Sequence, residues 1–222
     1  MIENNVKNLL KNLTLTNPFG ERVTLVAAVK LQSPDDINAA IAAGITDIGD
    51  NHVQEFRDKF DEIRGEPKRH FIGRLQTNKV KYLVGKVDLY HSVDRLNLAQ
   101  VLSEKSEKAE VISNVLLQVN IGNEESKGGF SLDETDAAYA IIRALPAIKI
   151  TGLMAMLPDT DDKKLLYSLA EKMRQKYDYF RERDENFTHL SMGMSGDYEL
   201  CISAGSNMIR LGTAIFGNRN YK

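Results

Sequence analysis

Short apolar runs alternate with helix-like segments along nearly the whole chain. Eight runs have the length and composition of buried strands. They cover residues 23–29, 45–49, 70–73, 89–92, 114–120, 148–154, 188–191 and 208–211. Each is followed by a segment in which apolar residues recur at helical spacing or a helix-start signal appears. This rhythm predicts parallel strands joined by crossover helices.

Local signals indicate where several of these helices begin. Ser33 with the proline after it is typical of a helix start, with Ser as the N-cap. Thr77 opens a predicted helix through residue 84, and Asp94 caps one that runs to about residue 108. Ser131 starts a predicted helix to residue 145, and Gly196 one to about residue 204.

The count of eight strand–helix units predicts the fold class: a single α/β domain over residues 1–222, built as a (β/α)8 TIM barrel. The amphipathic segment at residues 2–13 predicts an extra N-terminal helix that covers the barrel bottom or packs on its side. Because short strands are easily over-counted, a doubly wound sheet of five to seven strands remains the alternative.

Composition narrows the class of protein. The 42% of hydrophobic residues suits a globular chain, and 29 Lys+Arg against 31 Asp+Glu give a net charge of -2, which argues against a nucleic-acid binder. The single cysteine suits a reducing compartment. No apolar run approaches the roughly 18 residues that span a bilayer, and residues 1–13 are polar and amphipathic and lack the apolar core of a signal peptide. We expect a soluble cytoplasmic protein without membrane contact.

A barrel of this kind carries its active site where strands end. Lys30 closes an otherwise uncharged strand, and the period of two places it with Thr24, Val26 and Ala28 on the face that suits the barrel interior. A partly desolvated lysine there becomes a usable amine nucleophile. The alternative is a strand-end lysine that simply reaches water.

Two loops at the end of the chain have the composition of a phosphate site. Ser195 follows the seventh strand beside glycines, and Gly212 with Thr213 follows the eighth. Free N–H groups with a hydroxyl at a helix start bind phosphate, and phosphate sites after strands seven and eight recur in TIM barrels. The alternative for Ser195 is a plain N-cap.

Other candidates carry less chemistry. Arg210 is unusual in an apolar strand; it either pairs with an interior acid or faces a ring nitrogen or an anionic group. The four histidines lack metal-ligand spacing, so no metal site is expected. Cys201 is expected to be a buried, inert thiol. Lys127, in the polar loop 124–129, is a rival amine that we interpret as solvated.

A set of motifs in fixed order resembles the pyridoxal phosphate homeostasis proteins, single-barrel relatives of the alanine racemase N-terminal domain. The motifs are AAVK at 27–30, GDNHVQE at 49–55, HFIG at 70–73, LQTNK at 75–79, HSVD at 91–94, QVN at 118–120, KG at 127–128, GLMAM at 152–156, LSMGMS at 190–195 and RLGTAIFG at 210–217. The likeness runs from about residue 23 to 217.

The resemblance implies pyridoxal 5′-phosphate (PLP) as the cofactor and assigns a role to eight positions. It implies a Schiff base on Lys30, phosphate contacts from Ser195, Gly212 and Thr213, pocket positions for Asn51, Met154 and Ser191, and Arg210 near the pyridine nitrogen. Two positions depart from the family pattern: Asp50 stands where Glu is usual, and Arg74 where Pro is frequent. These departures concern the strand-two and strand-three loops only.

The expected function is binding and intracellular delivery of PLP without catalysis. An arginine at the pyridine nitrogen disfavours ring protonation and weakens the electron sink. The tyrosine that serves racemases as a second base has no match here, since neither Tyr198 nor Tyr221 corresponds to it. A PLP-dependent racemase-like enzyme is the main alternative, and an aldolase-like barrel with Lys30 on a sugar phosphate is the third. PLP-dependent apo-enzymes are the expected partners, and a monomer is expected.

Overall fold

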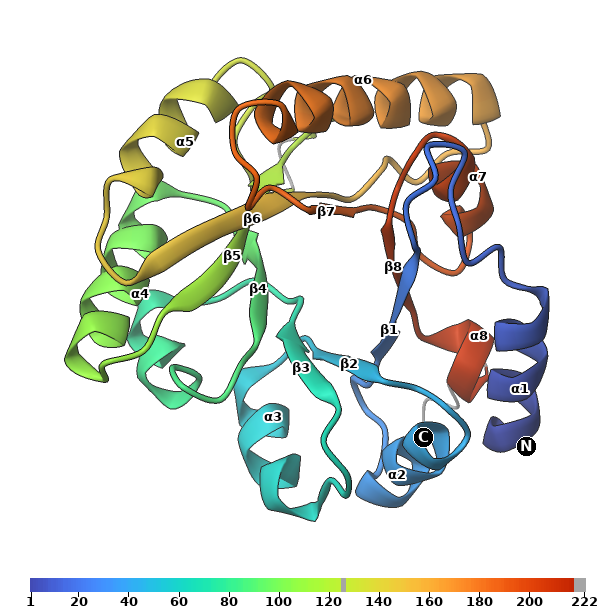
Figure 1. Ribbon diagram of the computed structural model, residues 1–222. Helices are drawn as coiled ribbons and strands as arrows, with labels where there is room; N and C mark the ends of the chain where they lie inside the picture. Colours follow the sequence, from blue (N-terminus) through green and yellow to red (C-terminus); the bar gives the residue numbers. More distant parts are fainter. Residues whose placement is uncertain (125–126, 218–222) are drawn as a thin grey trace.

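The protein forms a closed barrel of parallel strands that follow one another in sequence order, with β1 beside β8. The computed structural model describes residues 1–124 and 127–217, and Figure 1 shows the strands in the middle with the helices around them. The strands are β1 (Thr24–Ala28), β2 (Asp47–Asp50), β3 (Lys68–Phe71), β4 (Leu89–Val93), β5 (Ser113–Val119), β6 (Ile148–Ala155), β7 (His189–Ser191) and β8 (Met208–Leu211). The TIM barrel is confirmed, and the doubly wound alternative is wrong.

The helices fill the crossovers between strands. They are α1 (Ile2–Asn12), α2 (Pro34–Ala42), α3 (Val53–Lys59), α4 (Leu96–Lys108), α5 (Thr135–Arg143), α6 (Lys163–Arg181), α7 (Tyr198–Ser203) and α8 (Thr213–Phe216), with 3₁₀ turns η1 (Phe60–Glu62) and η2 (Thr77–Tyr82). The third crossover is therefore a 3₁₀ turn and not the α-helix predicted from Thr77. Its β-branched residues, such as Val80 and Val84, disfavour an α-helix.

The predicted helix starts are partly right. Ser33 caps α2 as predicted: its Oγ accepts the Asp36 N–H at 3.1 Å. Asp94 does not cap α4, which begins two residues later; its carboxylate instead accepts a hydrogen bond from Arg95. Asp94 does not act as the N-cap because its carboxylate is engaged in the ion pair with Arg95.

The last two predicted starts lie too early in the sequence. Ser131 Oγ accepts the Glu134 N–H at 3.2 Å while Glu134 Oε2 accepts the Ser131 N–H at 2.8 Å, but the α-helix itself begins at Thr135. Similarly, α7 begins at Tyr198 with Asp197 as its N-cap, so Ser195 is not a cap. Both predicted starts include the turn that precedes the helix.

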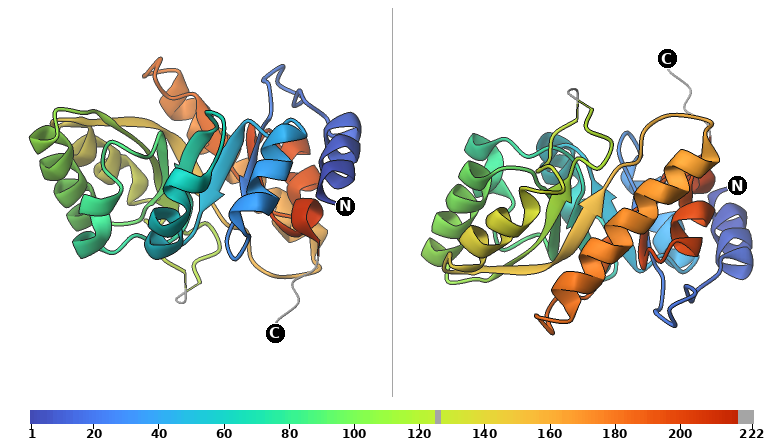
Figure 2. Two further views of the ribbon diagram at one scale, coloured as in Figure 1. Left: turned by 90° about the horizontal axis from the view of Figure 1, so that it is seen from below. Right: turned by 90° about the horizontal axis from the view of Figure 1, so that it is seen from above.

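The extra N-terminal helix lies on the side of the barrel. Helix α1 packs against α2 and α8, and Asn5 Nδ2 donates to the Ile215 carbonyl at 3.0 Å. Figures 1 and 2 show α1 outside α8 and away from the barrel mouth. Of the two predicted positions, the side is confirmed and the bottom is wrong.

Alternating burial along β1 separates an outer layer from the barrel interior. Leu25 and Ala27 pack with apolar side chains of α1 and α2. Val26 instead joins Leu116 and Met154, together with side chains from β4 and β8, in a separate cluster. Period two therefore assigns the two faces as predicted, and it directs the residues at the end of β1 toward the barrel mouth.

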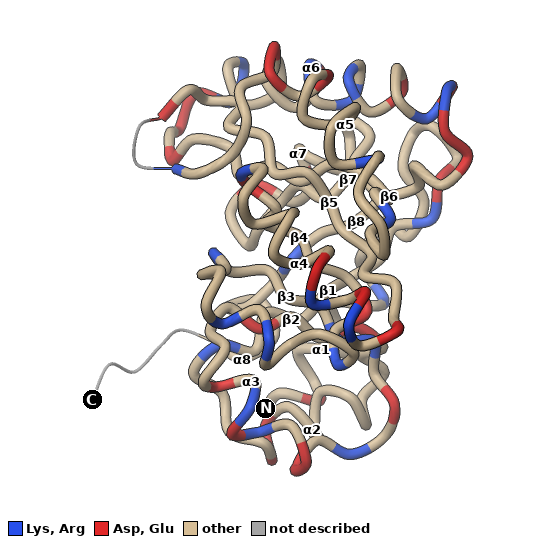
Figure 3. The backbone as a smooth tube through the Cα atoms, turned by 90° about the vertical axis from the view of Figure 1, so that its left-hand side faces the viewer, with Lys and Arg blue, Asp and Glu red and all other residues tan. Residues whose placement is uncertain are grey.

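Surface charge is mixed in sign. Figure 3 shows Lys and Arg interspersed with Asp and Glu over one side of the molecule, including the length of α6. Across residues 1–124 and 127–217, no helix combines the length and the apolar character that crossing a membrane requires. No cluster of three metal-ligating His, Cys, Asp or Glu side chains occurs in the same ranges.

Candidate functional site

A cavity of about 300 Å³ opens at the carboxyl ends of the strands. Its size is at the lower end of small-molecule sites. Its walls come from the ends of β1, β2, β3, β6 and β8, the loop after β7, and α8. The lining residues are Ala28, Lys30, Gln32, Asn51, Ile72, Met156, Met194, Ser195, Gly196, Arg210, Gly212, Thr213, Phe216 and Gly217. Six of the eight positions assigned from the sequence therefore share one cavity.

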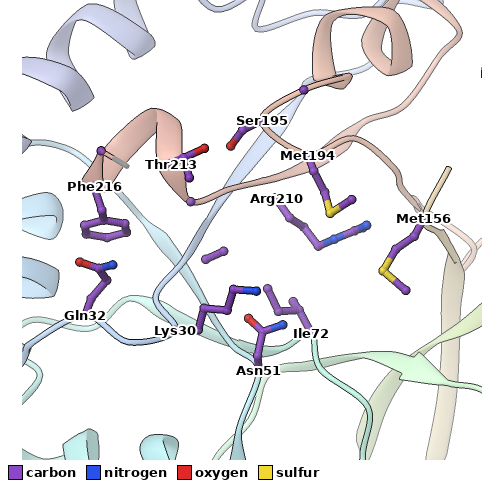
Figure 4. A pocket seen from close by; sticks show the side chains of 14 residues that line it. Lys30, Gln32, Asn51, Ile72, Met156, Met194, Ser195, Arg210, Thr213 and Phe216 are labelled. Atoms are coloured by element: carbon purple, nitrogen blue, oxygen red, sulfur yellow. The ribbon is translucent and has the colours of Figure 1, made fainter. Parts of the chain in front are cut away.

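Lys30 lies two residues beyond the end of β1 and is half-buried. Figure 4 shows its side chain extending into the cavity beside Asn51. The turn is tied to β2, because the Val29 N–H donates to the Gly49 carbonyl at 3.0 Å. Among the described residues, no carboxylate forms an ion pair with the Lys30 amine. The amine is therefore directed at the cavity rather than at a charged protein partner.

Hydroxyl groups and free N–H groups meet across the cavity from Lys30. Figure 4 shows Ser195 and Thr213 next to each other there. The N–H groups of Ser195, Gly196 and Thr213 donate to no acceptor among residues 1–124 and 127–217. A Cβ added at Gly196 would meet nothing within 4 Å, and one at Gly212 would meet only Ala28 at 3.5 Å or more. The glycines thus leave space over a row of hydrogen-bond donors, as an anion cradle requires.

Asn51 presents an unsatisfied acceptor to the same cavity. Its Oδ1 is buried and has no hydrogen-bond partner among the described residues. Gly73 fixes the backbone here: an added Cβ would lie 2.0 Å from the Asn51 carbonyl oxygen. A buried amide oxygen without a donor is costly, so this atom is suited to a ligand hydroxyl or amine.

Arg210 is held beneath the cavity by three hydrogen bonds and pairs with no acid in the described part of the chain. Its Nη1 donates to the Ser191 carbonyl at 3.0 Å and also to the Ser191 hydroxyl, and its Nη2 donates to the Ala155 carbonyl at 3.0 Å. Burial lowers the pKa of Arg210 to about 10, so it stays charged at neutral pH. Of the two alternatives for Arg210, pairing with an interior acid is wrong, because carbonyl oxygens and a hydroxyl accept its hydrogen bonds within the described chain.

Two of the eight predicted positions do not line the cavity. Met154 belongs to the apolar cluster inside the barrel and is 1% exposed. Ser191 is fully buried, and it contacts Arg210 from below. Met156, two residues further along the same side of the chain as Met154, takes the wall position.

Eight lining residues were not assigned to the site from the sequence, which are Ala28, Gln32, Ile72, Met156, Met194, Gly196, Phe216 and Gly217. Side chains alternate between the two faces of a strand, and this alternation, continued one residue past the end of β6, places Met156 on the same face as Met154. Periodicity gives no signal for Phe216, which lies at the end of the short helix α8. Cys201 is confirmed as a buried thiol, and burial raises its pKa. Tyr221 lies outside the described residues.

The sequence model described as "Alanine racemase, N-terminal domain" matches residues 2–220, so the chain belongs to that family. Curated relatives define its place within the family. The Pyridoxal phosphate homeostasis protein of Aquifex aeolicus is 40% identical over 199 residues, covering 89% of this chain and 87% of the relative. That of Escherichia coli strain K12 is 38% identical over 205 residues, covering 90% and 88%. The chain is therefore a member of the pyridoxal phosphate homeostasis proteins.

Solved structures agree with this assignment. PipY of Synechococcus elongatus PCC7942, in a structure with PLP bound, is 28% identical with a TM-score of 0.85, covering 98% of this chain and 100% of PipY. Alanine racemase of Clostridium difficile 630 has a TM-score of 0.73 at 15% identity, and this chain covers 56% of it. The racemase comparison shows the shared fold alone.

Proposed function

We propose that the protein binds PLP and acts in its intracellular homeostasis and delivery. One observation carries the proposal: an amine, Lys30, faces a row of anion-binding donors across a single cavity. PLP has an aldehyde that forms a Schiff base with an amine and a phosphate that needs such donors. The homeostasis proteins of Aquifex aeolicus and Escherichia coli and the PLP-bound PipY structure support the same ligand.

The side chains around the cavity suit the parts of PLP. Lys30 holds the aldehyde carbon, and Ser195, Gly212 and Thr213 hold the phosphate. The unpartnered Asn51 Oδ1 accepts a hydrogen bond from the linkage or the ring hydroxyl. Arg210 keeps its Nε–H and one Nη2–H free of partners in the described chain, and these would be the donors available to the ring nitrogen of bound PLP. Met154 and Ser191 lie outside the cavity. Met154 supports the site by packing inside the barrel, and Ser191 supports it through its hydrogen bond with Arg210.

The lining chemistry favours a carrier over a catalyst. Among the described lining residues, the titratable side chains are Lys30 and Arg210. Racemisation of an amino acid at PLP by two bases needs a positioned acid or base in addition to the lysine that the amino acid displaces. Arg210 donates to the ring nitrogen without protonating it and so weakens the electron sink. We therefore propose a non-catalytic role.

The open mouth of the cavity suits transfer of the cofactor to other proteins. Met194 is 40% exposed and Thr213 is exposed as well, so the phosphate side faces solvent. We propose PLP-dependent apo-enzymes as recipients, a monomer as the working form and the cytoplasm as the compartment. A single barrel domain suffices for this role.

Borohydride reduction followed by peptide mapping tests the proposal. Protein loaded with PLP is reduced, digested and searched for the phosphopyridoxyl adduct, and we expect it on Lys30. Lys30→Ala should lose the yellow colour and the adduct, whereas the matched variant Lys127→Ala should keep both. An adduct on another lysine, or equal PLP retention by wild type and Lys30→Ala after gel filtration, would overturn the assignment.

A second experiment addresses catalysis. The PLP-loaded protein is incubated with single-enantiomer amino acids in deuterated water. We expect no α-deuterium incorporation above that given by free PLP. Rapid incorporation that disappears in Lys30→Ala would contradict the non-catalytic role while leaving PLP binding intact.

A further inference from the structure

A continuous line of hydrogen-bonded side chains crosses the barrel interior from β2 to β8. Asp47 Oδ1 lies 3.0 Å from His70 Nε2, and His70 Nδ1 lies 2.9 Å from His91 Nε2. His91 Nδ1 lies 3.1 Å from Ser191 Oγ, which accepts a hydrogen bond from Arg210. We call these five residues the interior chain. It links the amino end of β2 to the floor of the cofactor cavity.

The interior chain is shielded from solvent throughout. His91 and Ser191 are 0% exposed, His70 is 2%, and Asp47 and Arg210 are 6% and 5%. Breaking any one of these hydrogen bonds would leave a buried polar atom without a partner. Because that is costly, the interior chain is expected to stay fully hydrogen-bonded. The two formal charges stand at its ends, an acid at the start and a guanidinium at the cavity.

Hydrogen-bond chemistry gives the chain one direction. The Arg210 guanidinium only donates, so Ser191 Oγ accepts from it and its own hydrogen is free to reach His91 Nδ1. A neutral His91 that accepts at Nδ1 carries its hydrogen on Nε2 and donates to His70 Nδ1. His70 then carries its hydrogen on Nε2 and donates to Asp47. Every link is satisfied with both rings neutral.

The charge states of the ends and of the central ring agree with this direction. Burial would raise the pKa of Asp47, but hydrogen bonds from His70 and Thr46 outweigh it, and the pKa is lowered. Burial, with the nearby His70 and Arg210, holds the pKa of His91 well below its ordinary value. Asp47 is thus an anion and His91 is neutral at physiological pH.

We propose that Asp47, His70, His91 and Ser191 are positioning residues that fix the Arg210 guanidinium, leaving its free N–H groups aimed at the ring nitrogen of PLP. This inference rests on the proposed function for the ligand, whereas the direction of the chain does not depend on it. Arg210 Nη2 is anchored by the Ala155 carbonyl, and Nη1 is shared between the Ser191 carbonyl and the Ser191 hydroxyl, which is the last link of the interior chain. Loss of the hydroxyl leaves Nη1 with one anchor, so the guanidinium can tilt.

The opposite direction is the competing arrangement. Because Asp47 is ionised, this arrangement needs an imidazolium at His70 that donates to both Asp47 and His91, and a His91 that carries its hydrogen on Nδ1. Ser191 Oγ would then accept from His91 and from Arg210, and its hydroxyl hydrogen would have no acceptor among the described residues. The two arrangements differ in the protonated nitrogen of His91, which is measurable.

The first experiment reads the tautomers in protein without PLP. Nitrogen-15 NMR of the histidine rings at neutral pH should show His70 and His91 neutral and both protonated at Nε2. Signals are assigned with the single variants of each histidine. A hydrogen on His91 Nδ1, or an imidazolium at His70, would overturn the proposed direction.

The second experiment reads the ring nitrogen of bound PLP. With PLP labelled with nitrogen-15 in the ring, Ser191→Ala should move the resonance from the wild-type value toward that of the PLP imine in water. The Kd for PLP should rise about tenfold, as expected for one lost hydrogen bond to a charged group. An unchanged resonance and Kd in a folded Ser191→Ala protein would overturn the positioning role.

Matched variants separate positioning from general stability. His91→Asn keeps an oxygen near the place of Nδ1 and should retain a resonance close to the wild-type value, whereas His91→Leu should behave like Ser191→Ala. The control is His189→Asn, since the His189 ring makes no hydrogen bond to the described chain and should leave the resonance unchanged. If His91→Asn matched His91→Leu in resonance and Kd while both remained folded, a purely steric role of the ring would replace the proposal.

The two hypotheses fail in different ways. If wild-type protein takes up no PLP on Lys30, the proposed function fails, and the tautomer measurement still tests the interior chain. If wild type binds PLP on Lys30 and Ser191→Ala gives the same ring-nitrogen signal, the positioning role alone is wrong.

Discussion

The Leu31 N–H donates a 2.7 Å hydrogen bond to the Glu55 carboxylate, which ties the turn after Lys30 to α3. Leu31 has a φ of 62°, in the left-handed region that leucine seldom adopts. Glu55 is held in turn by an ion pair of 2.9 Å with Lys59, one helical turn along α3. The backbone that presents Lys30 to the cavity is thus strained and is held by one carboxylate.

Removal of this carboxylate should disturb the Lys30 turn. We expect Glu55→Ala to lower the free energy of unfolding by about 1–2 kcal/mol, because the Leu31 N–H loses its acceptor and the strain is no longer opposed. PLP retention should fall as well. Urea unfolding of the protein without PLP, and equilibrium dialysis against PLP, measure the two effects.

A matched glutamate gives the control for Glu55. Glu104 is exposed on α4 and forms no ion pair in the described part of the chain, so Glu104→Ala should change neither quantity. If Glu55→Ala bound PLP as tightly as Glu104→Ala does, the Leu31 contact would have no part in presenting Lys30.

The phosphate side of the cavity gives the second prediction. Ser195→Ala and Thr213→Ala should each weaken PLP binding by about 1–3 kcal/mol, or roughly 5- to 150-fold, because each removes a hydrogen bond to an anion. Ser168→Ala, on the exposed face of α6, is the control and should bind as wild type does. Unchanged affinity in both cavity variants would mean that the phosphate binds elsewhere.

The strand pattern could be predicted because it depends on residues that are neighbours in sequence. The run before Lys30 predicts both the strand and its interior face, and Ser33 and its proline predict the start of α2. The ends of strands in a barrel lie at one rim, so Lys30, Asn51 and Thr213 could be grouped from their order alone.

The interior chain could not be predicted in the same way. The hydrogen bonds that link His70, His91 and Ser191 join residues 21 and 100 positions apart. Their geometry depends on the stagger of the strands, which period two does not specify. The same stagger decides depth within the barrel, so Met154 lies below the cavity while Met156 lines it.

Substitution by alanine should affect the free energy of unfolding differently at two glycines. Gly73→Ala would place a Cβ 2.0 Å from the Asn51 carbonyl oxygen, so β2 and β3 must separate. We expect a loss of about 1–3 kcal/mol in the free energy of unfolding, as for overpacking, together with weaker PLP binding. Gly196→Ala meets nothing within 4 Å and should leave stability within about 0.5 kcal/mol.

PLP binding distinguishes the roles of these glycines further. Because Gly196 lines the cavity, its alanine variant should still bind PLP less tightly although it folds as wild type does. Urea unfolding and dialysis on the same two variants provide the measurement. Equal stability of the Gly73 and Gly196 variants would contradict the close approach of Gly73 to Asn51.

Asp50 gives a prediction about pH. Burial raises the pKa of its carboxyl to about 6, a rise that the Lys59 and Arg69 charges reduce only in part. Between about pH 4 and 6 the folded protein keeps a proton on Asp50 that the unfolded chain has released. The contribution of Asp50 to the free energy of unfolding therefore falls as pH rises through this window.

Asp50→Asn removes that penalty, because the amide needs no proton to be neutral. The variant should exceed wild type in stability at pH 7.5 by up to about 3 kcal/mol more than it does at pH 4. Urea unfolding at pH 4, 5, 6 and 7.5 measures the difference, and Asp159→Asn, in an exposed loop, is the control. Other carboxyl groups, such as Glu21 and Asp47, have lowered pKa values and stabilise wild type and variant alike as pH rises. A stability difference between Asp50→Asn and wild type that does not change from pH 4 to 7.5 would show that Asp50 ionises as freely in the folded protein as in the unfolded chain.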